Sequence, residues 1–254
     1  MKIETLQWNI GGGKIREQSS DPGAESSYVL DGMGYMADLI KKLSPAIITL
    51  VETHANNKTV QAEEIANALG YGYWVNDVYD QSHIEAGMGL GQAIVSRFPI
   101  SSHDFSLFYN PKFETVRPNG EKWVSHNKGL TTGILDMEGK ELAVMTLHLI
   151  PFRKFGVPLD DQRVESARKS IVEKIKTDPG HLLLQGDFNV DDQSLKGFLP
   201  EVMGKCQEVL SDKPTTPKGR RYDHVVYKGM MHIKSEVIET LTDHFPVYSE
   251  FEVN

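Results

Sequence analysis

The chain has 254 residues, of which 39% are apolar and 24% are charged, with 27 basic and 35 acidic side chains and a formal net charge of −8. This composition is that of an ordinary globular protein, which excludes a disordered chain, and no stretch approaches the ~20 uninterrupted apolar residues of a membrane-spanning helix. The acidic balance argues against a protein whose main activity is non-specific charge pairing with duplex nucleic acid, and the single cysteine, Cys206, excludes a disulfide framework.

Short apolar runs rich in β-branched residues recur along the chain and predict buried strands. In chain order they are Ile3 to Trp8, Ala46 to Val51, Gln92 to Val95, Leu142 to Leu147, His181 to Leu184 and Tyr222 to Tyr227. Further strands are expected in Ser101 to Tyr109 and in Leu130 to Glu141, where Glu138-Gly139 is a hairpin signal.

Two amphipathic patterns between these strands predict helices. One contains Met36, Leu39, Ile40 and Leu43 and stops at Ser44-Pro45, and the other contains Val164, Ala167, Ile171 and Ile175 behind a cap at Asp160 or Asp161. No linker or repeat divides the chain. We therefore expect a single domain over residues 1–254, with stacked sheets and helices outside them.

Four polar side chains stand just past predicted strands: Asn9, Glu52, His148 and Asp187. Since strand carboxyl ends tend to meet at one rim where helical crossovers join the strands, these four are expected to share a cleft. A single polar residue at a strand exit is as often only the first solvated position. A carboxamide, two carboxylates and an imidazole together, however, are the groups of metal-assisted hydrolysis.

Seven short motifs follow one another from end to end of the chain. They are Leu6-Gln7-Trp8-Asn9-Ile10, Leu50-Val51-Glu52, Ser96-Arg97-Phe98-Pro99-Ile100, Thr146-Leu147-His148, Gln185-Gly186-Asp187-Phe188-Asn189, Tyr222-Asp223-His224 and Thr242-Asp243-His244-Phe245-Pro246-Val247. In this order they resemble the motifs of the endonuclease/exonuclease/phosphatase superfamily.

The resemblance implies the DNase I-like α/β fold, a four-layer sandwich of two mixed, mainly antiparallel sheets packed face to face with helices outside. It also implies hydrolysis of phosphate esters with Mg²⁺ or Mn²⁺. The substrate stays open, because the superfamily includes DNases, abasic-site nucleases, DNA–protein crosslink phosphodiesterases, sphingomyelinases and inositol phosphatases.

Three residues are the candidate metal ligands. Glu52 is the main one, Asp243 is expected on the opposite side, and the neutral Asn9 is expected to orient Glu52, the metal or its waters. The chemistry calls for a cation here, because a cluster of carboxylates would otherwise repel a phosphate ester. A hard divalent ion inverts the local field and stabilises the charge that grows in the transition state.

The attacking water needs a base within hydrogen-bond reach, and two assignments are open. In the first, Asp187 accepts the proton directly while Asn189 holds the water or a phosphate oxygen. Alternatively, His244 is the base and Asp223 fixes its tautomer. In both assignments His148 is expected to donate to the scissile phosphate.

Basic residues flank the predicted rim and are the candidate substrate-binding residues: Lys14, Arg16, Arg153, Lys154, Arg220 and Arg221. In these loops they would hold distal phosphates, which favours a multi-phosphate ligand such as nucleic acid. Phe152 and Phe155 are expected to add stacking contacts. The run Gly11-Gly12-Gly13 is interpreted as a flexible rim of the substrate site.

The first functional hypothesis is therefore a metal-dependent phosphodiesterase acting on nucleic acid or a nucleic-acid end. The alternative within enzymes is a phosphatase or phosphodiesterase of a small or lipid-linked phosphate, such as an inositol phosphate or a sphingomyelin-type headgroup. A non-catalytic binding module is disfavoured, because all the residues needed for catalysis are present. We expect a cytoplasmic protein with no membrane span, since no signal-like segment opens the sequence, and we predict no protein partner.

The remaining histidines show no metal-ligand spacing and are interpreted as surface or core residues: His54, His83, His103, His126, His181 and His232. His224 is expected to point away from the side of the strand that carries Asp223 and to be structural. Arg97 is expected to support the fold.

Overall fold

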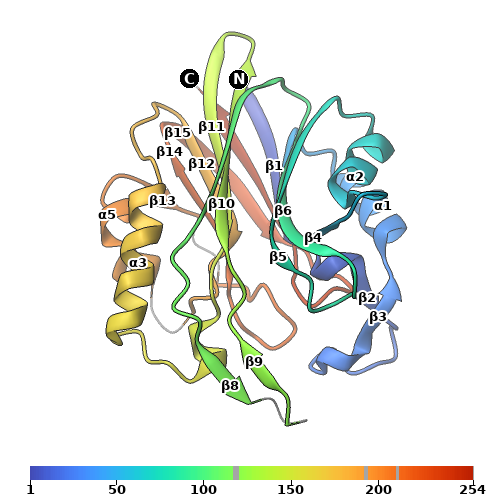
Figure 1. Ribbon diagram of the computed structural model, residues 1–254. Coiled ribbons are helices and arrows are strands. Elements are labelled where there is room, and N and C mark those ends of the chain that lie inside the picture. Colours follow the sequence, from blue (N-terminus) through green and yellow to red (C-terminus); the bar gives the residue numbers. More distant parts are fainter. Residues whose placement is uncertain (117–119, 192–193, 210–211, 254) are drawn as a thin grey trace.

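The computed structural model describes residues 1–116, 120–191, 194–209 and 212–253. Within these residues two six-stranded sheets pack face to face, and helices cover the outer side of each (Figure 1). The four-layer sandwich expected from the sequence is confirmed. The two termini lie near each other at the end of the sandwich drawn at the top of Figure 1.

The elements are named as in Figure 1. The first sheet contains β1 (Lys2–Asn9), β4 (Ile47–Ala55), β5 (Tyr73–Gln81), β6 (Gly89–Ser96), β15 (Met230–Val237) and β16 (Val247–Val253). The second contains β7 (Ile100–Leu107), β10 (Gly129–Met137), β11 (Lys140–His148), β12 (Leu182–Asp187), β13 (Gln207–Glu208) and β14 (Asp223–Lys228). Two small hairpins are formed by β2 (Lys14–Arg16) with β3 (Tyr28–Asp31) and by β8 (Glu114–Val116) with β9 (Lys122–Val124). The helices are α1 (Met33–Leu43), α2 (Gln61–Leu69), α3 (Gln162–Lys174), α4 (Leu195–Phe198) and α5 (Pro200–Met203), and the 3₁₀ turns are η1 (Gly11–Gly13), η2 (Glu25–Ser27) and η3 (Phe152–Phe155).

The strand order brings the predicted site residues to one end of the sandwich. The orders are β15-β16-β1-β4-β6-β5 and β13-β14-β12-β11-β10-β7, with β1 parallel to β4 and β11 parallel to β12. Asn9 pairs with Val51 at the ends of β1 and β4, and His148 pairs with Asp187 at the ends of β11 and β12. Because β14 is antiparallel to β12, its first residue, Asp223, lies opposite Asp187.

Side-chain alternation along the strands divides the interior into three parts: the core between the first sheet and its helices, an apolar zone between the sheets and a polar zone between the sheets. In β1, Leu6 and Trp8 pack towards α1 and α2, whereas Ile3 faces the other sheet. Between the sheets, the end near the termini is apolar and contains Ile3, Leu183 and Phe251. Next comes a fully buried layer that we call the polar belt: Thr5, Gln7, Thr49, Gln92, Thr131, Thr146 and Gln185.

The polar belt ties the two sheets together by hydrogen bonds between side chains. Gln185 donates to Thr5 at 3.1 Å and accepts from Thr49 at 3.1 Å, and Gln92 donates to Thr131 at 3.1 Å. Buried polar groups are costly unless they are bonded in this way, and among the described residues three atoms of the belt have no hydrogen-bond partner: Gln7 Oε1, Gln92 Oε1 and Thr146 Oγ1. The belt therefore separates the apolar interior from the functional end and fixes how the sheets align there.

Local signals in the sequence agree with several element boundaries. Helix α1 ends at Ser44, whose φ of 55° places it in the left-handed region. Asp161 caps α3 by accepting from the backbone N–H of Arg163 at 2.8 Å. The predicted turn at Glu138 and Gly139 joins β10 to β11, with φ of 57° and 89°. Among the described residues, none of the helices combines the length and the hydropathy needed to cross a bilayer.

Candidate active site

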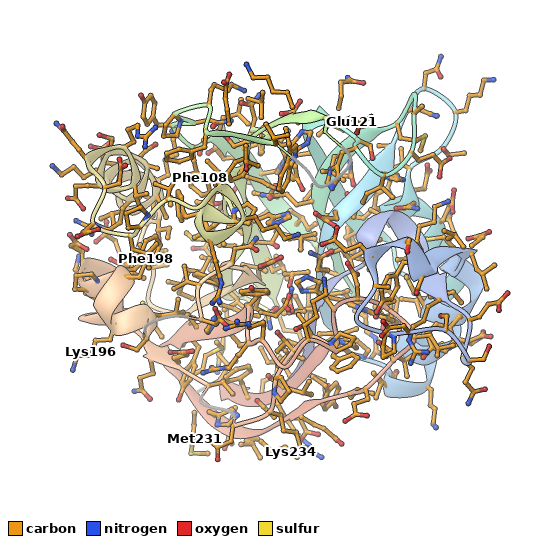
Figure 2. All side chains as sticks on the ribbon, turned by 90° about the horizontal axis from the view of Figure 1, so that it is seen from below. Phe108, Glu121, Lys196, Phe198, Met231 and Lys234 are labelled. Carbon is orange, nitrogen blue, oxygen red and sulfur yellow. The ribbon has the colours of Figure 1, made fainter. Side chains whose placement is uncertain are left out.

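The site lies at the end of the sandwich that Figure 2 views from below. A cavity of about 320 Å³ opens there. Its lining includes both sheets and the loops that follow them, with Asn9, Glu52, His148, Asp187, Asn189, Asp243 and His244 among the contributors. These predicted residues come from positions 9 to 244 of the chain, and the fold brings them together. Asp223 lies directly behind His244 and outside the cavity lining.

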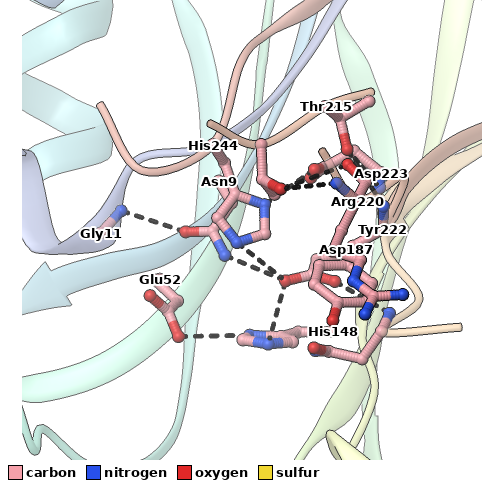
Figure 3. Close-up of polar contacts among 12 residues, drawn as sticks. Asn9, Gly11, Glu52, His148, Asp187, Thr215, Arg220, Tyr222, Asp223 and His244 are labelled. Atoms are coloured by element: carbon pink, nitrogen blue, oxygen red, sulfur yellow. Dashed lines mark hydrogen bonds and ion pairs between the residues drawn. The ribbon is translucent and has the colours of Figure 1, made fainter. Parts of the chain in front are cut away.

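Asp187 is the centre of the polar contacts (Figure 3). Its Oδ2 accepts from Asn9 Nδ2 at 3.1 Å and lies 3.4 Å from His148 Nε2 and 3.8 Å from His244 Nε2. Its Oδ1 accepts from the backbone N–H of Asn189 at 2.9 Å. Burial raises the pKa of Asp187 to about 7, although the nearby His244 opposes this shift. This carboxylate can therefore take up a proton near neutral pH.

The residue before Asp187 must be glycine for steric reasons. A Cβ on Gly186 would lie 2.0 Å from the carbonyl oxygen of Leu147 in the neighbouring strand β11. Only glycine lets β11 and β12 approach so closely that His148 and Asp187 become direct neighbours.

His244 and Asp223 form a hydrogen-bonded pair. His244 Nδ1 lies 2.7 Å from Asp223 Oδ2, and Gln7 of the polar belt donates to Asp223 Oδ1 at 3.0 Å. The indole of Trp8 donates to the carbonyl of His244 at 3.0 Å, which fixes the loop that carries the histidine. Burial alone would lower the pKa of His244, but Asp223 and Asp187 raise it to about 10. The imidazole is therefore cationic at neutral pH.

Glu52 reaches the cavity because of a β-bulge. The pairing of β4 with β6 shifts between Val51 and Thr53, which leaves Glu52 as an extra residue with φ of 56°. In β4 the preceding even-numbered residues, Ile48 and Leu50, pack towards the helices. Without the bulge Glu52 would follow them, so the strained backbone redirects its carboxylate.

His148 is surrounded by donors. Lys128 Nζ lies 2.8 Å from its Nδ1 and the hydroxyl of Tyr79 lies 3.1 Å from the same atom. Burial and the adjacent Lys128 hold the pKa of His148 well below its usual value, so the ring is neutral. We assign the proton to Nε2, because Nδ1 faces two donors. A neutral His148 can thus donate one hydrogen bond towards Asp187 or a substrate oxygen.

Lys128 adds a second positive charge, in addition to that of His244, beside the acidic residues. Burial lowers its pKa to about 8, while Glu52 and Asp187 work against that shift. Burial would raise the pKa of Glu52, but Lys128 and neighbouring imidazoles lower it instead. The ammonium and the Glu52 carboxylate therefore stabilise each other's charged forms in a site that is otherwise costly for ions.

The donor set fits a hard divalent cation. Glu52 and Asp243 offer carboxylate oxygens to the same cavity, and burial raises the pKa of Asp243. Burial raises the pKa of both Asp187 and Asp243, and a divalent ion beside these two carboxylates would favour their charged forms. Asn9 accepts from the backbone N–H of Gly11 at 3.0 Å and donates to Asp187, so its carboxamide is already held in place.

A second grouping of possible ligands lies beside it. It consists of one possible ligand atom from each of three residues, Asp187, Asp223 and His244, and these atoms all lie within 4.8 Å of one another. Since a proton already bridges the imidazole and Asp223, we regard this grouping as an acid–base cluster and Glu52 with Asp243 as the residues that would hold the ion.

Gly11 lines the cavity, as expected for a rim residue, but the expected flexibility of Gly11-Gly12-Gly13 is wrong. All three glycines are buried and have φ of 50°, 65° and 78°. A Cβ on Gly12 would lie 2.4 Å from the ring of His54, and one on Gly11 would lie 3.0 Å from Asp243 Oδ1. The glycines therefore form a tight turn beneath the site, because side chains there would displace His54 and Asp243.

The six predicted basic residues separate into three groups. Lys14 and Lys154 line the cavity. Arg220 lies 3.0 Å and Arg153 4.0 Å from Asp191. Two point elsewhere: Arg16 donates to three backbone carbonyls of its own loop, and Arg221 bonds to Glu208 and to a backbone carbonyl. Only the first group is placed to meet a ligand directly.

The prediction of stacking contacts needs correction for Phe152, which is buried in the hydrophobic core beneath α3. Phe155 does line the cavity, where it stacks on Trp123 with ring centroids 4.6 Å apart. Two of the histidines interpreted as surface or core residues, His83 and His126, lie at the cavity surface. Their rings stack at 4.8 Å.

His224 and Arg97 behave as predicted. His224 bonds to Glu208 at 2.7 Å and to the carbonyl of Val190, away from the cavity. Arg97 donates to the backbone of Ser44 and to the hydroxyl of Tyr71, which joins α1 and α2 to the sheet.

Sequence reasoning missed Lys128 and Tyr79. The strand-end rule applies to residues that follow strands, whereas Lys128 precedes β10. Because β10 is antiparallel to β11, the start of β10 lies at the same end of the sheet as His148. Tyr79 is interior to β5, and its ring lies 4.9 Å from the ammonium of Lys128. A search for polar residues at both ends of every strand would have found the lysine.

Two mixed sheets with an acidic and imidazole cluster at one end define the DNase I-like class of folds. The model of the Endonuclease/Exonuclease/phosphatase family matches residues 6–244. The chain belongs to this family.

Solved structures agree in fold. An endonuclease/exonuclease/phosphatase from Beutenbergia cavernae is 14% identical with a TM-score of 0.75, and the match covers 100% of this chain and 72% of the other. TDP2 of D. rerio, solved with a single-strand DNA product, is 14% identical with a TM-score of 0.65, covering 99% of both chains. A mannosyl-6-phosphatase from Bacteroides thetaiotaomicron is 18% identical with a TM-score of 0.64, covering 98% of this chain and 99% of the other. A search of curated protein sequences gives no match.

Proposed function

We propose that this protein is a divalent-metal-dependent phosphodiesterase that acts on nucleic acid, most simply at a strand end. The observation that supports it is the convergence of Glu52, Asp187 and His244 on one cavity that also contains cationic Lys128. A cavity of about 320 Å³ is at the small end of the range for ligand sites. It suits a terminal nucleotide better than the side of a duplex.

The residues divide the chemistry between them. Glu52 and Asp243, with Asn9 holding Asp187, would bind Mg²⁺ or Mn²⁺, which when present would polarise the phosphate and offset its charge. Asp187, with its pKa of about 7, is the better base for the attacking water. His244, with its pKa of about 10, remains an imidazolium that hydrogen-bonds a non-bridging phosphate oxygen.

The leaving oxygen needs a proton or a strong donor. His148 is neutral and donates a hydrogen bond only, whereas Lys128 beside it has a pKa of about 8 and can release a proton at neutral pH. We therefore assign the support of the leaving group to the Lys128–His148 pair. Asn189 bonds to Asp187 and to the carbonyl of Leu149, which positions the base.

The test is a substrate panel run with Mg²⁺, with Mn²⁺ and with EDTA. It contains single-stranded and abasic duplex oligonucleotides, inositol phosphates, mannose 6-phosphate and sphingomyelin. We expect EDTA-sensitive product release from oligonucleotides and a loss of at least about a thousandfold in kcat for Asp187→Asn with an unchanged circular dichroism spectrum. Inertness towards every nucleic acid in the panel would refute the proposal.

A second candidate is hydrolysis of a small sugar or lipid-linked phosphate. The enclosed aromatic wall of Trp123 and Phe155 favours it, since an aromatic face beside a phosphate site also suits a sugar ring. Activity on mannose 6-phosphate or inositol phosphates alone would select this candidate. A cytoplasmic location stays a prediction, which fractionation of cells that express the protein would test.

A further inference from the structure

Two lysines from separate segments meet a single carboxylate at the edge of the cavity. Lys154 belongs to η3, Lys218 lies in the loop before β14, and Glu25 belongs to η2 between β2 and β3. Both ammonium groups lie 3.5 Å from the same atom, Glu25 Oε1. Glu25 and Lys154 line the cavity together with Glu52, Asp187 and Asp243.

The contacts are too long for good hydrogen bonds, which in proteins span roughly 2.7–3.2 Å. A single carboxylate, that of Glu25, is the ion-pair partner of both ammonium groups. A phosphate monoester carries about −1.5 to −2 charges at neutral pH and has three acceptor oxygens. It would neutralise both lysines and give each its own oxygen.

Glu25 differs from the other acidic partners of basic residues in this region. Its side chain is 73% exposed, whereas those of Glu85, Asp191 and Glu208 are 47%, 10% and 9% exposed. Exposed ion pairs contribute little to stability, so a ligand can replace Glu25 at a cost of at most about fivefold in affinity.

Lys154 connects this cluster to the reaction centre. Burial would lower its pKa, but Glu25 first and then Glu52 and Asp243 raise it, so it stays charged. Its Nζ also lies 5.9 Å from the ring of Trp123. The indole of Trp123 therefore lies beside the ammonium of Lys154, where it can contact a ligand ring that links two phosphate groups.

We propose that Lys154 and Lys218 form a second phosphate subsite, filled in this structure by the Glu25 carboxylate and taken over by a second phosphate of the substrate. This inference rests on the proposed phosphoesterase function of the same cavity. The substrate class becomes a compound with two phosphates separated by one ring, such as a strand end that carries a terminal phosphate.

The experiment measures binding and does not depend on turnover. Thymidine 3′,5′-bisphosphate and the two thymidine monophosphates are titrated into the full chain by calorimetry in the presence of Ca²⁺. The parent is expected to bind the bisphosphate at least about tenfold more tightly than either monophosphate. Lys218→Gln should reduce that ratio about five- to tenfold, and Glu25→Gln should increase it up to about fivefold.

Glu114→Gln is the matched control, because Glu114 forms an exposed ion pair with Lys122 at 2.8 Å in the β8–β9 hairpin. It should leave the ratio unchanged. Equal affinities for bisphosphate and monophosphates in the parent, or a lower ratio in Glu25→Gln, would overturn the subsite. If the bisphosphate is preferred but no oligonucleotide is cleaved, the subsite stands and the proposed nuclease function fails.

Discussion

Replacing Lys128 by methionine should stabilise the protein without metal and at the same time remove its activity. The lysine is 4% exposed and lies within 3.1 Å of both ring nitrogens of His148. Burial of an ammonium is unfavourable, and Glu52 and Asp187 compensate for only part of that cost. Methionine has nearly the same length and shape but no charge, so it avoids the cost.

The size of the effect follows from the pKa of Lys128. It is lowered from 10.5 to about 8, which at about 1.36 kcal/mol per pKa unit corresponds to on the order of 3 kcal/mol. Since the folded-state value lies below the unfolded one, the penalty is constant below about pH 8. It fades as the pH rises towards 10.5, where the unfolded chain also loses the proton.

Urea unfolding in EDTA, monitored by circular dichroism at pH 7 and at pH 9.5, tests this prediction. Lys128→Met should have the higher free energy of unfolding at pH 7, and the difference from the parent should roughly halve at pH 9.5. Lys122→Met, a change at a 63% exposed side chain, should stay within about 0.5 kcal/mol of the parent. A Lys128→Met protein that is less stable than the parent at pH 7 would refute the reasoning.

Three further predictions concern residues around the site. Gly186→Ala should lower the free energy of unfolding by about 3 kcal/mol or more, because the new Cβ would lie 2.0 Å from the backbone of β11. Gly72→Ala is the control and should have little effect, because the space around its Cβ is open; thermal melts of the two variants test this. Gln7→Leu should lower kcat about ten- to a hundredfold at constant KM, because it removes the hydrogen bond that holds Asp223 against His244. Gln185→Leu in the same belt should lower only the Tm, and steady-state kinetics of both variants test this difference. Burial would raise the pKa of Glu208, but its histidine and arginine partners lower it, so the stability that Glu208 contributes is present above about pH 4.5 and is lost on acidification. Glu208→Gln should therefore flatten the fall in Tm between about pH 5 and pH 3, and an unchanged slope would contradict this.

The grouping of three residues of the candidate site could be predicted because their positions follow from strand ends. Asn9, His148 and Asp187 each close a strand, and parallel pairing makes such ends meet. That rule needs only the apolar runs and the polar residues that follow them. It gives no information about residues that precede an antiparallel strand, which is why Lys128 was missed.

Glu52 shows a different limit. It lines the cavity, although regular alternation along β4 would turn its side chain towards α1 and α2. The bulged strand β4 has no glycine or proline of its own to signal the bulge, and Gly91, which pairs with Thr53 there, belongs to the neighbouring strand β6. The buried turn at Gly11–Gly13 was misread for a related reason, since its need for glycine comes from His54 and Asp243, which are distant in sequence.

The features that sequence rules missed share a physical origin, because each is locally unfavourable and is maintained by its surroundings. Glu52 and Asn189 have φ of 56° and 51°, a conformation that costs non-glycine residues about 1–3 kcal/mol when strained. Lys128 is a charge in a buried position. Propensity and periodicity report what a segment prefers by itself, so they are least informative where the chain is held against its preference. In this protein the polar belt and the paired strands β11 and β12 hold these segments in their unfavourable conformations. The strained backbone and the buried charge are concentrated on the residues that would meet the ion, the water and the phosphate.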